Sequence, residues 1–403
     1  MNILRLIATM DPASGGPCQG IRNSIPELKK LGVRNEVVCL DDPSSAFLKD
    51  DPFTVHAIGL RKGPWQYNAN LISWLLKNFH RFDAVIIHGL WLYPSYAVNK
   101  AINLFKTQRK NNDEVFHIPK IFVMPHGMLD PYFQEAKGRK LKAIRNSWYW
   151  KLIEKHVVNN ADGLLFTCEE ELRLAHKPFG SYHPKTEINV GYGIKRPPAY
   201  SAKMKDAFLA ACPSLNEAPY FLFLSRIHEK KGVDVLIKAY AFFLNKRTGQ
   251  GNRLPKLVIA GPGADSTYGL KLRKLIDGEP GLFDNILFPG MLLGDAKWGA
   301  YYGCAAFILP SHQENFGIVV IESLACSKPV LISDKVNIWQ EIEKAGAGIV
   351  GSDSVEGTLE LIEVWDRMTN EEKNAMQLNA RSLFEEKYTS AAAASTLLQA
   401  VSQ

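Results

Sequence analysis

Short, uninterrupted apolar runs alternate with longer amphipathic stretches along the whole chain, and this alternation limits the possible folds more than any other feature. The first half carries the runs NILRLIA, NEVVCL, DAVIIHG, KIFVMPHG and DGLLFTC, and the second half carries YFLFLS, KLVIAG, NILFPG, CAAFILPS and KPVLIS. Continuous apolar strands separated by helical segments indicate parallel sheets with both faces covered. The sequence therefore predicts an α/β protein built from doubly wound parallel sheets.

The alternation is interrupted once, over residues 196–216, where prolines are frequent and strand-forming residues are few. Such a stretch is typical of a linker. We therefore expect one Rossmann-like domain over residues 1–195 and a second over residues 217–385. An Ala-rich C-terminal helix over residues 386–403 could belong to either domain, and one arrangement has it crossing back to the first.

Composition excludes several classes of protein. Hydrophobic residues make up 46% and charged residues 22% of the 403, which is usual for a globular protein and argues against disorder. No run of 18 apolar residues is present, so no transmembrane helix is expected. The formal charge of +7 favours anionic ligands or an anionic surface, and no nucleic-acid-binding module is visible.

The six cysteines are scattered and form no CxxC pair. This usage favours reduced thiols in a cytoplasmic protein over a disulfide framework. No group of cysteines and histidines has the spacing of metal ligands. We therefore expect neither a metal nor another cofactor.

A group of basic residues follows the apolar run YFLFLS. Arg226 comes directly after the predicted strand, and Lys231 and Gly232 lie a few residues later. Asp234 is placed to cap the next helix. Two cations at the start of a helix suit a diphosphate, although a solvated basic loop has the same pattern.

Two carboxylates flank a second glycine loop. Glu314 and Glu322 are eight residues apart, with Phe316 and Gly317 between them and an apolar helical run after them. Eight helical residues span about 12 Å, which suits two ends of one extended ligand. The alternative is a surface Glu314 and a Glu322 at the edge of the core. Because its neighbours are apolar, Glu322 should have a polar partner.

These residues resemble the donor-site signature of the retaining glycosyltransferases of family 4, which have the GT-B fold. The resemblance is carried by Arg226, Lys231-Gly232, Glu314 and Glu322, and continues through Ala325-Cys326, Lys328-Pro329-Val330, Gln340-Glu341-Ile342, Ala345-Gly346-Ala347-Gly348 and, near the N-terminus, Gly15-Gly16. Ser225 and Ser327 replace glycines that are more usual in the family. The GT-B resemblance implies two Rossmann-like domains facing each other across a cleft.

The resemblance also implies roles for individual residues. Arg226 and Lys231 would hold the diphosphate of a nucleotide sugar, and Glu322 would bind the ribose hydroxyls. Glu314 would lie near the donor sugar. Backbone contacts would come from Phe316, Gly317 and Ile318, and further donor contacts from Gly16, Gly261 and Met291.

In the first domain, His126 follows the run KIFVM and matches the family's histidine that faces the sugar. Together with Glu314, Arg226 and Lys231 it completes the predicted catalytic set. The acceptor candidates are Gly15, His88 and Trp91. Each candidate also has a purely structural alternative: a hydrogen-bonded histidine for His126 and His88, an ordinary turn for Gly15, and aromatic packing for Trp91.

Residues 134–156 form a basic amphipathic stretch with Leu141, Ile144, Trp148 and Leu152 near helical spacing. Lysine and tryptophan together suit a membrane interface. Alternatively, this apolar stripe packs on the sheet of the first domain. The first interpretation predicts peripheral association with an anionic membrane, on its cytoplasmic face.

The function expected from the resemblance is retaining transfer of a hexose-type sugar from a nucleoside-diphosphate sugar to a hydroxyl of a saccharide or a lipid-linked glycan, in polysaccharide or surface-glycan synthesis. Positive side chains and helix N-termini, rather than a metal, would stabilise the departing diphosphate. Two alternatives stay open. One is a GT-B nucleotide-sugar 2-epimerase, and the other is a non-catalytic protein that binds nucleotide sugars.

Overall fold

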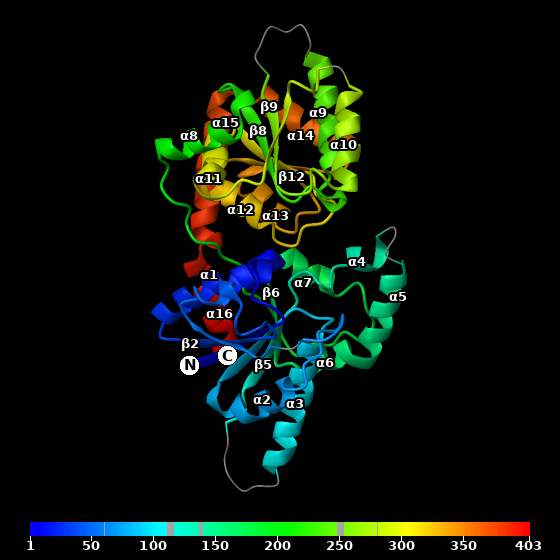
Figure 1. Cartoon of the computed structure of the whole chain (residues 1–403), viewed down its shortest axis with the longest axis vertical. Coiled ribbons are helices and arrows are strands. Elements are labelled where there is room, and N and C mark those ends of the chain that lie inside the picture. Colours follow the sequence, from blue (N-terminus) through cyan, green and yellow to red (C-terminus); the bar gives the residue numbers. More distant parts are fainter. Residues whose placement is uncertain (60, 111–116, 137–139, 248–253, 280) are drawn as a thin grey trace. The chain divides into compact units, whose positions relative to one another are not determined.

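The computed structural model describes residues 1–59, 61–110, 117–136, 140–247, 254–279 and 281–403. The chain divides into two compact units (Figure 1). The first unit comprises Met1–Lys195 together with Thr389–Gln403, and the second comprises Arg196–Tyr388.

The first unit is built on a parallel sheet of seven strands in the order β3-β2-β1-β4-β5-β6-β7. The strands are β1 (Asn2–Ile7), β2 (Arg34–Cys39), β3 (Thr54–Ala57), β4 (Ala84–His88), β5 (Lys120–Met124), β6 (Gly163–Phe166) and β7 (Glu187–Asn189). Every residue of the central strand β4 is buried. This burial explains why its sequence is continuously apolar rather than alternating.

Helices cover both faces of this sheet. They are α1 (Gly16–Lys30), α2 (Leu71–Asn78), α3 (Tyr93–Lys110), α4 (Tyr132–Glu135), α5 (Lys140–Tyr149), the π-helical turn η4 (Trp150–Glu154), α6 (Lys155–Asn160) and α7 (Glu169–Ala175). Helices α2, α3 and α6 pack on one face through Leu75, Val98 and Val157, in one core with Leu4 and Ile87 of the strands. The opposite face is covered by α1 and by the C-terminal helix.

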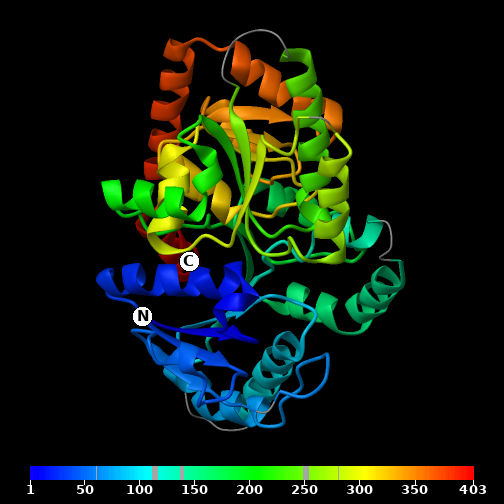
Figure 2. The same ribbon diagram turned by 45° about the horizontal axis from the view of Figure 1, so that its top comes forward.

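That C-terminal helix, α16 (Ser390–Ser402), belongs to the first unit although it follows the whole second unit in sequence. It packs beside α1, as Figures 1 and 2 show. Ala394, Leu397 and Val401 share a core with Leu28 of α1 and Ile3 of β1. The predicted crossing back to the first domain is confirmed.

The second unit holds a parallel sheet of six strands in the order β10-β9-β8-β11-β12-β13. The strands are β8 (Tyr220–Leu224), β9 (Lys256–Ala260), β10 (Ile286–Gly290), β11 (Ala306–Leu309), β12 (Val330–Ser333) and β13 (Gly348–Gly351). The helices are α8 (Ala202–Ala211), α9 (Val233–Arg247), α10 (Thr267–Asp277), α11 (Gly294–Gly303), α12 (Ile318–Ala325), α13 (Trp339–Lys344), α14 (Val355–Arg367) and α15 (Asn370–Leu383). The two parallel Rossmann-like sheets confirm the predicted fold class.

Residues 196–216, taken from the sequence as a linker, lie in the second unit and contain α8. This helix packs on α11, where a side chain at Gly299 would come within 2.0 Å of the Met204 carbonyl oxygen. Met204 and Phe208 are buried there. The prolines therefore lie on either side of a packed helix. This helix is stabilised because its apolar residues are buried against α11.

Candidate functional site

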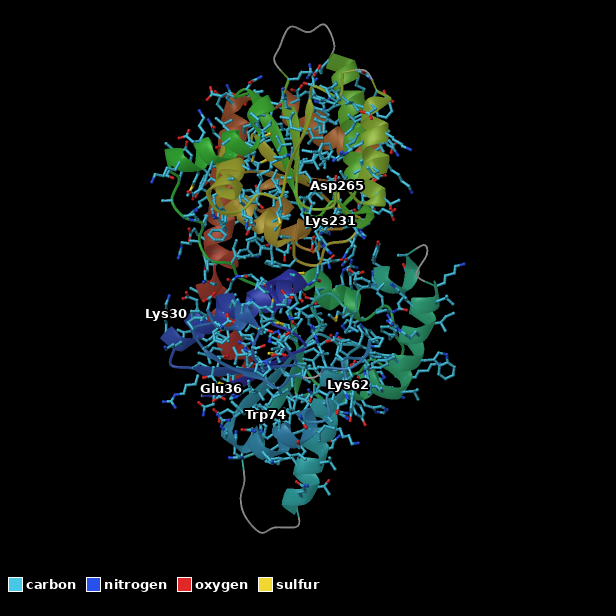
Figure 3. All side chains as sticks on the ribbon, in the orientation of Figure 1. Lys30, Glu36, Lys62, Trp74, Lys231 and Asp265 are labelled. Atoms are coloured by element: carbon cyan, nitrogen blue, oxygen red, sulfur yellow. The ribbon has the colours of Figure 1, made fainter. Side chains whose placement is uncertain are left out.

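Lys231 lies in the short turn η6 (Glu229–Lys231), between β8 and α9, and its ammonium forms an ion pair with the Glu314 carboxylate. Figure 3 shows Lys231 among the loops at one end of the second unit. The lysine is buried, with 7% of its surface exposed. Gly232 follows at φ 66°, and a side chain there would come within 2.1 Å of the Pro310 carbonyl oxygen. Only glycine allows the backbone at 232 to approach Pro310 this closely, and this approach fixes the position of the preceding Lys231.

Glu314 is held by its backbone on the opposite side of this ion pair. Its N–H donates to the Lys335 carbonyl oxygen at 2.9 Å, and its own carbonyl accepts from the Asn337 N–H at 2.9 Å. These bonds join the loop after β11 to the loop after β12. Two segments far apart in sequence therefore fix the position of one carboxylate.

Helix α12 begins directly after this loop. Gly317 caps it with φ 74° and ψ 63°, and Ile318 is its first residue. The first N–H groups of a helix have no acceptor within the helix and carry partial positive charge. Phe316 is 6% exposed, and its ring meets the Tyr388 ring edge-on at 5.6 Å. The loop is thus anchored by a buried aromatic side chain while its backbone N–H groups stand at a helix start.

Glu322 lies one turn further along α12 and is almost fully buried. Lys297 Nζ donates to its Oε1 at 2.5 Å, and Tyr301 Oη donates to its Oε2 at 3.0 Å. Burial and the neighbouring Glu322 charge raise the pKa of the Tyr301 phenol well above its ordinary value. The sequence predicted a polar partner for Glu322 but missed which residues supply it. The four-residue spacing of Lys297 and Tyr301 on one face of α11 is the signal that would have found them.

The other predicted donor residues follow the ends of β8, β9 and β10. Arg226 follows β8, is exposed, and forms no ion pair with any residue in the described part of the chain. A side chain at Gly261, after β9, would meet the Ser225 carbonyl oxygen at 2.0 Å, and the Gly261 N–H donates to the Gly290 carbonyl oxygen at 2.8 Å. Met291 comes next and is 64% exposed. The structure thus brings these three loops to one edge of the sheet.

Asp234 does not cap α9, because the helix begins one residue earlier at Val233. Its carboxylate instead accepts a hydrogen bond from Tyr268 Oη at 2.6 Å. This bond links α9 to α10, so the role of Asp234 is to join two helices.

In the first unit, His88 and His126 lie at the ends of β4 and β5 and contact each other. His88 Nδ1 and His126 Nε2 are 3.0 Å apart, and the rings are stacked with centroids 5.2 Å apart. Burial and, to a lesser extent, the nearby Arg5 charge lower the pKa of His126 to about 3. Burial, then the neighbouring His126 and then the Arg5 charge lower the pKa of His88 well below its ordinary value. Both imidazoles are therefore neutral at physiological pH.

The backbone around His126 is unusual. His126 has φ 54° and Gly127 has φ 79°. A non-glycine residue in the left-handed region is held there by its surroundings. Here the Gly127 N–H donates to the carboxylate of Glu171, which also accepts from the Thr167 N–H at 2.8 Å. The start of α7 therefore fixes the loop that carries the histidine.

The glycine pair lies before α1. Gly15 has φ 91° with open space around its α-carbon, which suits close approach of a ligand. Gly16 is the first residue of α1, and its carbonyl oxygen accepts from Tyr192 Oη at 2.5 Å. Tyr192 follows β7, so the far edge of the same sheet supports this loop.

Trp91 is fixed within the first unit. Its N–H donates to Glu154 at 2.7 Å, its indole Nε1 donates to the Met128 carbonyl oxygen at 3.2 Å, and its ring lies 5.4 Å from Phe179. Burial raises the pKa of Glu154 to about 7. These contacts place Trp91 in an aromatic cluster rather than on a free surface.

The basic amphipathic stretch forms α5 and η4, with residues 137–139 outside the described part of the chain. Its four apolar residues are exposed by 84% at Leu141, 57% at Ile144, 63% at Trp148 and 69% at Leu152. The interpretation in which this stripe packs on the sheet is wrong. The helix instead buries its other side, through Trp150 and Glu154.

The described residues contain neither a candidate membrane-spanning helix nor a candidate metal site. None of their helices is both long enough and apolar enough to cross a bilayer. Among the same residues, no three His, Cys, Asp or Glu side chains are grouped so as to hold a metal ion.

Two family comparisons match the chain. Residues 206–382 match the family of glycosyl transferases group 1, and residues 15–190 match the glycosyl transferase 4-like domain. The first range contains the Lys231–Glu314 pair and Glu322. The second contains the glycine pair, His88 and His126.

Curated relatives include D-inositol 3-phosphate glycosyltransferases. The protein of Acidothermus cellulolyticus is 30% identical over 130 residues, which is 32% of this chain and 29% of that protein. The protein of Streptomyces bingchenggensis is 27% identical over 198 residues, covering 49% of this chain and 43% of that protein. The chain thus matches less than half the length of either relative.

Solved structures share the fold along the whole chain. Anabaena HepE in complex with UDP superposes with a TM-score of 0.74 at 15% identity and covers 100% of both chains. Sucrose-phosphate synthase from Thermosynechococcus elongatus superposes with a TM-score of 0.71 at 18% identity and covers 100% of this chain and 98% of that one. Two matching family domains, two parallel Rossmann-like sheets and a shared GT-B fold lead to one conclusion: the chain belongs to the glycosyl transferases of group 1, the retaining glycosyltransferase family 4.

Proposed function

We propose that this protein is a retaining glycosyltransferase that moves a hexose-type sugar from a nucleoside-diphosphate sugar to a hydroxyl of a saccharide or a lipid-linked glycan. The observation that carries the proposal is the buried Lys231–Glu314 ion pair beside the start of α12. The lysine comes from the loop after β8, whereas the carboxylate and the helix start come from the loop after β11. Both loops lie at the sheet edge where ligands of open α/β sheets bind.

Breaking the bond between the sugar and the diphosphate leaves growing negative charge on the departing phosphate. Lys231 is buried, so its ammonium acts on that charge with little screening by water. The N–H groups at the start of α12 add fixed partial charges. Binding of the diphosphate would draw Lys231 from Glu314, leaving the Glu314 carboxylate free to accept hydrogen bonds from the sugar.

Glu322 is the group we assign to the ribose hydroxyls. Lys297 and Tyr301 already hold its two oxygens, which orients the carboxylate in a buried site. A carboxylate has further lone pairs that can accept from hydroxyl groups. In the first unit, neutral His126 is assigned to the donor sugar, as a group able to donate and accept hydrogen bonds without carrying charge.

The direct test is thermal unfolding of the full chain with UDP-, GDP- and ADP-glucose at equal concentration. UDP-glucose is the first choice, since Anabaena HepE was solved in complex with it. A bound donor raises the unfolding temperature by mass action. Lys231→Ala should lose this shift, while Lys238→Ala, at an exposed position of α9, should keep it. Failure of every nucleotide sugar to shift the wild-type protein would contradict the proposal.

We also propose that α5 and η4 dock on an anionic membrane, on the cytoplasmic face where a lipid-linked acceptor would be met. Leu141, Trp148 and Leu152 are exposed apolar groups, and Lys151 lies 5.8 Å from the Trp148 ring centroid. Exposed apolar residues beside lysines suit the boundary between headgroups and acyl chains.

Sedimentation with vesicles of anionic and of neutral lipid tests the docking. Trp148→Glu should abolish binding to anionic vesicles, whereas Leu378→Glu, at a 74% exposed leucine of the second unit, should not. Equal binding of the wild type and Trp148→Glu, or binding that is insensitive to salt, would remove the idea without affecting the donor site.

A further inference from the structure

Arg5 places a positive charge in the middle of β1, an interior strand of the first unit's sheet that pairs with β2 and β4. The residue is 1% exposed. Burial lowers the pKa of its guanidinium to about 9, so it remains charged at neutral pH. Its Nε donates to Asn35 Oδ1 at 3.1 Å, but its Nη2 is buried and has no hydrogen-bond partner. No carboxylate in the described part of the chain pairs with it.

His88 presents a second unpartnered nitrogen in the same place. Its Nδ1 contacts His126, whereas its Nε2 is buried and makes no hydrogen bond. The residue is 9% exposed. An isolated buried polar atom is unfavourable, and an isolated buried charge more so. A small ligand that accepts hydrogen bonds from both atoms would therefore stabilise them, because the described residues supply no partner for either.

A cavity of about 30 Å³ separates these atoms from the helices that cover this face of the sheet. Arg5, His88 and His126 line it, together with Ser24 of α1, residues 191–193 and Ser390 of α16. This volume admits roughly one or two particles the size of a water molecule. A bulky organic anion such as gluconate is much larger than this space.

We propose that this cavity binds a small monovalent anion of the size of chloride, held by Arg5 Nη2 and His88 Nε2. Both groups act as donors when His88 carries its proton on Nε2. A water molecule could occupy the space but would leave the guanidinium charge uncompensated. The anion supplies the missing countercharge.

The anion would also fix the tautomers of His88 and His126. The importance of this effect rests on the proposed function. With the proton of His88 on Nε2, its Nδ1 can only accept, so His126 donates from Nε2. His126 then keeps Nδ1 as its acceptor. One buried ion thus sets the hydrogen-bonding character of the histidine that we assign to the donor sugar.

Thermal unfolding of the full chain in sodium chloride and in sodium gluconate, at matched ionic strength, is the first test. Gluconate is too large for the cavity. At about ten times the dissociation constant, chloride should raise the unfolding temperature by about 3–6 °C relative to gluconate. Arg5→Met should remove this difference, and Arg34→Met, at an exposed arginine of β2, should retain it. Equal unfolding temperatures in the two salts, or a chloride effect that survives Arg5→Met, would overturn the proposal.

Anomalous diffraction from crystals of the wild-type protein grown in sodium bromide gives a readout that does not depend on the folding of a variant. A bromide peak within hydrogen-bond distance of Arg5 Nη2 and His88 Nε2 would support the site. A density without anomalous signal there would identify water and refute it. Neither measurement uses nucleotide sugar, so their failure would leave the donor site of the second unit untouched.

Discussion

The two units of this protein place functional groups at the ends of parallel strands in opposite electrostatic ways. The second unit uses buried ion pairs, Lys231 with Glu314 and Lys297 with Glu322. The first unit uses a contact between two neutral imidazoles, His88 and His126. One sheet architecture can therefore stabilise charge at one site and exclude it at another, depending on which side chains surround the strand ends.

Removing the Lys231 ammonium should have the largest effect, because the charged site depends on it. Lys231→Ala is expected to lower the rate of sugar transfer about 10²–10³-fold, the usual loss for a preorganised group that stabilises transition-state charge. Steady-state transfer assays measure this, with Lys238→Ala as the matched control. A near-normal rate for Lys231→Ala would show that the ammonium does not stabilise the departing diphosphate, and would remove the electrostatic contrast between the two units.

Glu322→Ala should reduce transfer at least tenfold, through weaker donor binding. The substitution removes the ribose acceptor and leaves Lys297 and Tyr301 without their buried partner. Glu322→Gln separates the two causes, since it keeps hydrogen-bonding capacity without charge. Glu343→Gln, at an exposed position of α13, should change nothing. A donor KM unaltered in both Glu322 variants would contradict this role.

The neutral histidines should make stability depend on pH. The folded pKa of His126 is about 3, and its unfolded pKa is about 6.5. The unfolded chain therefore binds more protons between these values, so the contribution of His126 is full above pH 6.5 and is lost as pH falls below it. The slope is about 1.4 kcal/mol per pH unit for each such group.

Denaturant unfolding from pH 5 to 7 measures that slope, and the informative quantity is the difference between the wild type and His126→Gln. The comparison of the two proteins is needed because Glu154, with its pKa raised to about 7, contributes with the opposite sign in this range. Identical pH dependence in the two proteins would show that His126 is not held neutral, and would remove the electrostatic contrast between the units.

The smallest expected effect concerns the residues that end two helices, α12 and α1. Helix α12 ends in a Schellman motif, in which the Ser327 N–H donates to Leu324 and the Lys328 N–H to Ser323, and Ser327 has φ 59°. Helix α1 ends in the same way at Gly32, with φ 78° and open space around it. Ser327→Gly should raise the free energy of unfolding by about 1 kcal/mol, and Gly32→Ser should lower it by a similar amount. Denaturant titration measures both, and a change of the same sign in both would contradict the argument.

The charged site was predictable because its residues lie in short segments next to strands. Arg226, Lys231, Glu314 and Glu322 each follow an apolar run or begin a helical one, and parallel topology brings such positions to one edge. The partners of Glu322 were not predicted, since Lys297 lies on another helix and only packing of α11 against α12 brings it near. The contact between Lys231 and Glu314, 83 residues apart, was likewise not predicted, although both residues were.

For the first unit the sequence predicted less. No prediction was made for Arg5, because the apolar run around it does not show which face of the sheet a single cation meets. In the structure, β1 is an interior strand and Arg5 is buried. The stripe of Leu141, Trp148 and Leu152 has the period of a helix face that packs on a core, and its periodicity cannot tell a core from a lipid surface.

The amino-acid sequence was enough to predict two parallel sheets, the loops that carry the charged groups, and the family to which those loops point. Its local patterns suffice for this, because strand burial, glycine turns and helix starts depend on neighbouring residues. The folded structure was needed to show that α16 completes the first unit, that Lys297 and Tyr301 hold Glu322, and that Arg5 lines a cavity beside two histidines. Those facts depend on contacts between distant segments, whose free energy is set by packing and burial rather than by local sequence.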